Sequence, residues 1–190
     1  APALLCGDAL LTESFALLVK SKAKPENINK AVAILCELSG YKGMIAGQAE
    51  DTFEQGKWQK KSKAVLAKKL KFIQLKKTSA LLCASLTIGA VLAGAGKKDL
   101  KILENYANNI GCAFQIIDDI LDVYADKKLL GKKGSDAANN KLTALSLYGR
   151  QKAGQMALNH IKAAKNAVSV YGKKAQMLNL LADYIIERKY

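Results

Sequence analysis

The chain has 190 residues, a formal net charge of +14 and a composition that is half hydrophobic. A chain of this length can bury a sizeable core, so we expect one domain over residues 1–190. Ala, Leu and Lys dominate, prolines occur only at Pro2 and Pro25, and no segment alternates apolar and polar residues with a period of two. This composition favours helices and argues against a sheet, so we predict an all-α fold.

Apolar periodicity and turn residues predict a series of helices that can pack antiparallel to one another. The predicted helices cover residues 3–20, 29–51, 62–94, 98–124, 151–171 and 175–188, with a short helical turn near 138–147. The third helix could break near Lys77. The uncharged stretch 78–96 is long enough for a membrane span. Because it is rich in Ala, Gly, Ser and Thr, we instead expect a buried core helix and no stable membrane insertion.

Lysine supplies nearly all of the positive charge and is densest between Lys57 and Lys77. A basic excess is typical of proteins that meet nucleic acid, an anionic membrane or small anionic substrates. Nucleic-acid readers usually rely on arginine forks and interleaved aromatic residues, which are scarce here. We interpret the lysine-rich segment as a solvated helix face and keep a basic helical nucleic-acid-binding protein as an alternative function.

Cysteine and histidine usage restricts the chemistry further. The four cysteines form no CxxC pair and lie within apolar stretches, so we expect buried thiols in a cytoplasmic protein: Cys6, Cys36, Cys83 and Cys112. The single histidine, His160, excludes a His-based metal cluster and argues against a Ser-His-Asp triad. It lies on a polar predicted helix, where we expect it to be exposed.

An acidic stripe interrupts the apolar run 110–123. Gln115, Asp118, Asp119 and Asp122 fall within an arc of about 100° on one helix face. Three neighbouring carboxylates repel one another and resist desolvation, so a cation must compensate for them. Oxygen ligands of this kind suit Mg²⁺, which often bridges carboxylates to a substrate phosphate. A solvated acidic stripe on an amphipathic helix is the alternative interpretation.

The irregular segment 125–136 follows the acidic helix directly. It contains Gly131 and Gly134 among four lysines. Backbone N–H groups and ammonium charges in such a loop can wrap a phosphate. Its position beside the carboxylates favours a site at which Mg²⁺, lysines and a polyanion neutralise one another.

Six segments, in order along the chain, resemble those of the trans-isoprenyl diphosphate synthases, the family of farnesyl and geranylgeranyl diphosphate synthases. Residues 114–122 (FQIIDDILD) resemble the second aspartate-rich motif of that family. The other segments are 7–11 (GDALL), 43–51 (GMxxGQxxD), 77–81 (KTxAL), 131–141 (GKxGxD…K) and 183–188 (DYIIER). The resemblance implies an antiparallel helix bundle around a deep central cavity.

The resemblance also implies a chemistry for these residues. An allylic diphosphate loses pyrophosphate to give an allyl cation, the double bond of isopentenyl diphosphate attacks that cation, and a proton is then lost. Mg²⁺ would be held by Asp118, with Asp119 and Asp122 in support and Gln115 orienting them. Asp136 would anchor the glycine- and lysine-containing loop behind the metal.

Cationic and hydroxyl groups would hold the diphosphate oxygens as negative charge develops on them. The resemblance gives Lys77, Thr78 and Lys132 this catalytic and substrate-binding role, with Lys141 as a further contact. Phe114 would belong to the apolar wall that keeps water from the carbocation.

Members of this family are longer, and this sequence contains no counterpart of their first aspartate-rich motif. We therefore interpret it as the C-terminal two-thirds of such an enzyme and expect the 190-residue chain alone to show little condensation activity. A natural non-catalytic subunit of a prenyl synthase is the alternative. The resemblance further implies a homodimer packed through helices.

Overall fold

The computed structural model describes residues 1–53, 55–58, 60–124 and 141–188. Helices account for almost all of these residues and no strand occurs among them, so the all-α prediction is confirmed. The α-helices are α1 (Pro2–Val19), α2 (Pro25–Ser39), α3 (Met44–Phe53), α4 (Lys63–Ile73), α5 (Ala80–Leu92), α6 (Lys97–Tyr124), α8 (Ala144–Tyr148), α9 (Arg150–Val168) and α10 (Gln176–Glu187). A π-helix, η1 (Gln74–Ser79), joins α4 to α5, and a 3-10 helix, η2 (Ser169–Ala175), joins α9 to α10.

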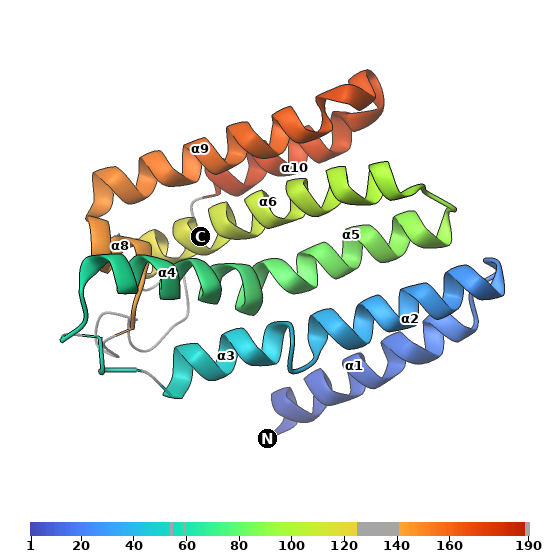
Figure 1. Ribbon diagram of the computed structural model, residues 1–190, viewed down its shortest axis with the longest axis horizontal. Helices are drawn as coiled ribbons and strands as arrows, with labels where there is room; N and C mark the ends of the chain where they lie inside the picture. Colours follow the sequence, from blue (N-terminus) through green and yellow to red (C-terminus); the bar gives the residue numbers. More distant parts are fainter. Residues whose placement is uncertain (54, 59, 125–140, 189–190) are drawn as a thin grey trace.

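The long helices lie side by side, and α6 occupies the middle of the row (Figure 1). It packs against α5 on one side and against α9 and α10 on the other, while α2 lies beyond α5 and α1 is outermost. The apolar side of α6 supplies large residues to the core: Tyr106, Ile110 and Ile116 are each at most 2% exposed. The acidic stripe is therefore carried by the helix whose other side forms the core.

Two predicted helices are interrupted in the structure. The prediction for 29–51 was wrong as one helix: the chain turns at residues 40–43 and continues as α3. The predicted helix 62–94 does break, because the π-helix η1 separates α4 from α5 around Lys77. The other predicted bounds agree within a few residues. Residues 138–140 of the predicted turn near 138–147 lie outside the described residues, and its described part contains most of α8.

The predicted burial of the cysteines holds for only two of them. Cys83 and Cys112 are buried, whereas Cys6 and Cys36 are exposed, although all four are free thiols. Cys6 is exposed because α1 lies at the edge of the bundle and packs mainly against α2, with Leu18 as its one buried residue. Cys36 lies on an exposed side of α2. By length and composition, α1 and the stretch Lys63–Leu92 could each cross a membrane. Core helices pass the same test, and five residues of α5 are buried, as predicted for the uncharged stretch.

His160 is half-buried, which corrects the expectation of an exposed side chain. Helix α9 lies along α6, and this contact brings His160 Nδ1 to 2.8 Å from Asn109 Oδ1. Burial lowers the pKa of His160, and the nearby positive charge of Lys71 lowers it further. The neutral imidazole is therefore the form that the folded chain favours.

The lowered pKa of His160 predicts a loss of stability in mild acid. The unfolded chain binds a proton at His160 near pH 6.5, above the pKa of the folded state, so protonation favours unfolding. The free energy of unfolding should therefore fall as the pH drops from 7 through 6.5. Denaturant titrations between pH 7 and 5.5 measure this slope. Because the chain has no other histidine, the slope should flatten in His160→Gln, and an unchanged slope would contradict the assignment.

Candidate functional site

The π-helix η1 holds two residues of the predicted site at the junction between α4 and α5. Lys77 Nζ donates to Asp51 Oδ2 of α3 at 2.6 Å, and the Asp51 residue is only 5% exposed. The Lys77 side chain stays 26% exposed. A buried carboxylate thus fixes the direction of a lysine whose ammonium group has further N–H donors for a ligand.

The next residue of η1 is linked to the acidic helix by a chain of hydrogen bonds. Thr78 Oγ1 donates to Gln115 Oε1 at 2.6 Å, and Gln115 Nε2 donates to Asp119 Oδ1 at 2.9 Å. Asp119 is 4% exposed, and the Gln115 amide donates to its carboxylate. These two hydrogen bonds orient Gln115 and Asp119 before any ligand binds.

Two glycines let the neighbouring helices touch the backbone of η1. A Cβ on Gly47 of α3 would stand 2.1 Å from the backbone nitrogen of Lys77, and one on Gly111 of α6 would stand 2.6 Å from Ser79 Cα. Ser79 is fully buried, and its hydroxyl donates to Gln74 O at 3.0 Å, five residues earlier, which stabilises the π-turn. The site therefore depends on close backbone packing at both sides of η1.

Four of the predicted site residues, together with Asp51, line a small polar cavity. Asp51, Lys77, Gln115, Asp119 and Lys141 line a space of about 20 Å³ together with apolar residues of α4. A neighbouring pocket of about 260 Å³ shares Asp119 and Lys141 with it. The structure thus brings Lys77 of the KT segment and Asp119 of the acidic segment to one cavity, although they lie far apart in sequence. Lys132 and Asp136 lie outside the described residues.

Asp118 is placed differently from Asp119. Its side chain is 41% exposed, and its Oδ1 lies 3.6 Å from Arg188. The Arg188 guanidinium also donates to Phe114 O at 3.0 Å and covers the Phe114 ring at 3.9 Å from the ring centre. Arg188, which follows α10, therefore links that helix to α6, and the Phe114 ring packs against its guanidinium group.

The carboxylates of α6 fit a magnesium site of the open type. Among the described residues, no three histidine, cysteine or carboxylate side chains gather into a metal cage. Mg²⁺ usually keeps several waters and binds through one or two carboxylates and a substrate phosphate. Asp118 and Asp122 are partly exposed oxygen donors one helical turn apart, which agrees with that donor set.

Sequence reasoning missed two residues of this site. Asp51 was not among the predicted site residues, yet it accepts a hydrogen bond from Lys77, and the GMxxGQxxD segment that it ends was the available signal. Arg188 closes the matching DYIIER segment, and its pairing with Asp118 needed the fold to bring α10 beside α6.

A family model for polyprenyl synthetase matches residues 1–181, and the chain belongs to this family. It is 38% identical over 189 residues to a geranylgeranyl diphosphate synthase of Cyanophora paradoxa, which covers 98% of this chain and 61% of that protein. It is 37% identical over 196 residues to the farnesyl diphosphate synthase of Escherichia coli K12, with 99% and 64% covered. The family predicted from six segments is confirmed.

Solved structures agree with the fold. A putative farnesyl-diphosphate synthase from Marinomonas sp. MED121 matches with a TM-score of 0.77 and 35% identity, over 97% of this chain and 62% of that one. A geranyltransferase from Helicobacter pylori, complexed with magnesium and isoprenyl diphosphate, matches with a TM-score of 0.76 and 29% identity, over 97% and 59%. The chain spans less than two-thirds of the length of these relatives.

Close packing at η1 predicts that an added methyl group destabilises the chain. Gly47→Ala should lower the free energy of unfolding by about 2 kcal/mol or more, because the new Cβ overlaps the Lys77 backbone. Gly89→Ala in α5 is the matched control: its Cβ meets nothing within 4 Å, and alanine favours the helix by up to about 1 kcal/mol. Urea denaturation compares the two variants, and equal stabilities would contradict the packing argument.

Proposed function

We propose that this protein is a prenyltransferase of isoprenoid biosynthesis, which extends an allylic diphosphate with isopentenyl diphosphate. The main observation is that the KT segment and the aspartate-rich segment meet in a member of the polyprenyl synthetase family. Hydrogen bonds link Thr78 to Gln115 and Gln115 to Asp119, and Lys77 lines the same cavity as Asp119. The names of the relatives support the same substrate class.

The described residues suggest how a diphosphate would be held. Lys77 would donate the N–H groups not used by Asp51 to oxygens of the leaving diphosphate, and Lys141 would add charge from the other wall of the cavity. Thr78 and Gln115 would keep Asp119 aligned. Fixed cations lower the barrier because about three negative charges develop on the departing group.

Asp118 and Asp122 would hold magnesium, with Asp119 in support. Mg²⁺ bound there supplies positive charge that stabilises the leaving diphosphate. Arg188 pairs with the same Asp118 carboxylate and would hold it in position while the metal is absent. Lys132 and Asp136 keep their proposed roles as a phosphate contact and an anchor of the loop.

The test is binding, because the 190-residue chain alone should have little condensation activity. Isothermal titration with geranyl diphosphate should detect binding in Mg²⁺ and much weaker binding in EDTA. Asp118→Asn should weaken the Mg²⁺-dependent affinity by about ten-fold, since one charged metal ligand is lost. Robust incorporation of labelled isopentenyl diphosphate by this chain would contradict the expected inactivity.

Glu104→Gln is the matched control for Asp118→Asn, since it removes one exposed carboxylate from the same helix several turns away. It should bind geranyl diphosphate like the parent chain. Affinity that is independent of Mg²⁺ and equal in both variants would sink the proposal. Steeply salt-dependent binding to duplex DNA that Asp118→Asn leaves intact would favour the nucleic-acid alternative.

We also propose that the protein is a homodimer. The outermost helix leaves large apolar side chains in solvent, with Leu4 71%, Leu10 67% and Val19 67% exposed. An apolar pocket of about 730 Å³ lies between α1, α2 and α5. A two-fold interface would cover this surface.

Sedimentation at several salt concentrations tests the dimer. The net charge of +14 opposes association, so the dimer should tighten as salt screens the repulsion. Leu10→Glu should shift the equilibrium toward monomer, whereas Leu158→Glu, on the exposed side of α9, should leave it unchanged. A monomer at every salt concentration would contradict the proposal.

Finally, we propose a cytoplasmic location. All four thiols are free, and free thiols are typical of a reducing compartment. We propose in addition that the chain does not insert stably into a membrane. Recovery of the chain in the soluble fraction of a detergent-free cell lysate would support this.

A further inference from the structure

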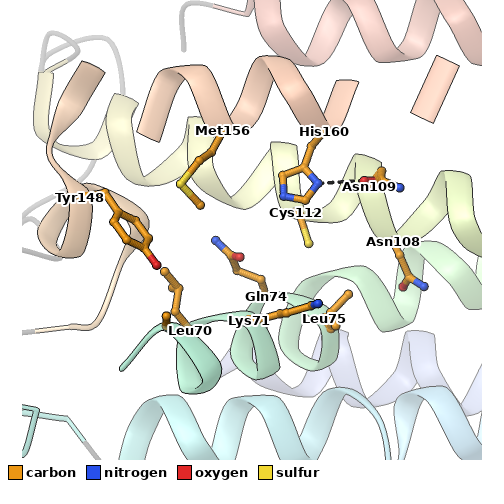
Figure 2. A pocket seen from close by; sticks show the side chains of 11 residues that line it. Leu70, Lys71, Gln74, Leu75, Asn108, Asn109, Cys112, Tyr148, Met156 and His160 are labelled. Atoms are coloured by element: carbon orange, nitrogen blue, oxygen red, sulfur yellow. Dashed lines mark hydrogen bonds between the residues drawn. The ribbon is translucent and has the colours of Figure 1, made fainter. Parts of the chain in front are cut away.

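A further pocket lies between α4, η1, α6, α8 and α9 (Figure 2). Its volume is about 490 Å³, which is within the range of small-molecule sites. Leu70, Tyr148 and Met156 gather at one end, and His160, Asn108 and Asn109 at the other. Lys77, Thr78 and the aspartates of α6 do not line it, but Leu70 and Gln74 line both this pocket and the small polar cavity of the proposed diphosphate site, so the two spaces are neighbours with a shared wall.

Gln74 provides an unused donor in the wall of this pocket. The residue is only 4% exposed, and its Nε2 has no hydrogen-bond partner among the described residues. Figure 2 shows the amide extending into the space between Tyr148 and His160. A buried donor without an acceptor costs about 1–3 kcal/mol, and a ligand atom that accepts from it recovers that energy.

The polar end also contains an oriented histidine. Asn109 Nδ2 donates to Asn105, so Asn109 Oδ1 accepts from His160 Nδ1. The other ring nitrogen points toward the pocket (Figure 2). Burial keeps the pKa of His160 below its usual value, so this nitrogen carries a lone pair in the folded chain.

Lys71 adds a positive charge to the same wall. Among the described residues, no carboxylate forms an ion pair with it. Burial lowers the pKa of His160 on α9 and raises the pKa of Cys112 on α6, and the charge of Lys71 acts to lower the pKa of both groups. The positive potential of Lys71 therefore extends across the cavity.

We propose that this pocket is a binding site for a small amphiphilic anion, with its phosphate or carboxylate group near Lys71 and Gln74 and a compact apolar body against Leu70, Tyr148 and Met156. Lys71 supplies a positive charge for the anionic group, and the Gln74 amide donates a hydrogen bond to it. The apolar end removes the apolar body of the ligand from water. The site goes beyond the proposed diphosphate chemistry and does not depend on it.

Methionine methyl signals report directly on this pocket. The chain has three methionines: Met156 lines the pocket, Met44 lines the apolar pocket beside α1, and Met177 is 74% exposed on α10. In EDTA, 1-naphthyl phosphate or 1-naphthoate, titrated to millimolar concentration into the chain with ¹³C-methyl methionine, should shift Met156 and leave Met177 in place. Inorganic phosphate and 1-naphthol should each bind at least about five-fold more weakly, because each lacks one half of the recognition.

Variants separate this site from general charge attraction. Lys71→Gln should weaken 1-naphthyl phosphate binding by about ten-fold. Lys68→Gln, an exposed lysine of the same helix outside the pocket, should leave binding unchanged. A Met156 signal that no probe moves, equal effects of the two lysine variants, or equal binding of inorganic phosphate and 1-naphthyl phosphate would each overturn the proposal. Loss of the diphosphate site through Asp118→Asn should not alter the Met156 shift.

Discussion

Backbone contact on both sides of η1 is the constraint on which the rest of the site depends. α3 approaches the Lys77 backbone through Gly47, and α6 approaches Ser79 through Gly111, so neither glycine position leaves room for a side chain. This contact places Lys77 within reach of Asp51 and Thr78 within reach of Gln115. Larger residues at either glycine would push the helices apart and lengthen both hydrogen bonds, because interiors are close-packed and transmit displacement.

The carboxylates of the site fall into a buried pair and an exposed group. Asp51 and Asp119 are buried and held by Lys77 and by the Gln115 amide, which satisfies their desolvated oxygens. Asp118 remains partly in water beside Arg188. The buried carboxylates therefore serve as fixed supports, whereas the exposed one can exchange its partner at little desolvation cost. This division suits a site that must accept and release a multiply charged ligand.

The sequence predicts the helices and the family, and it nominates candidate site residues, because periodicity and local motifs are encoded within short segments. It does not predict which helix face is covered by a neighbour. His160 and Cys36 show this: α9 buries the first against α6, while nothing within the described chain covers the second. Asp51 and Arg188 were missed as site residues for the same reason, since their partners lie 26 and 70 residues away and only tertiary packing brings them together.

The π-helix also restricts how this chain can vary in length. An α-helix gains about 100° of rotation per residue, and a π-turn holds one residue more than an α-turn. The wide turn absorbs the extra residue, so deleting one residue between Ile73 and Ala80 would let the segment close as an ordinary α-helix with little change in the rotation of α4 relative to α5. The wide turn itself would be lost, and with it the hydrogen bond from the Ser79 hydroxyl to Gln74 O five residues earlier. The placement of Lys77 opposite Asp51 and of Thr78 opposite Gln115 therefore depends on the extra residue, whereas the direction of the flanking helices does not.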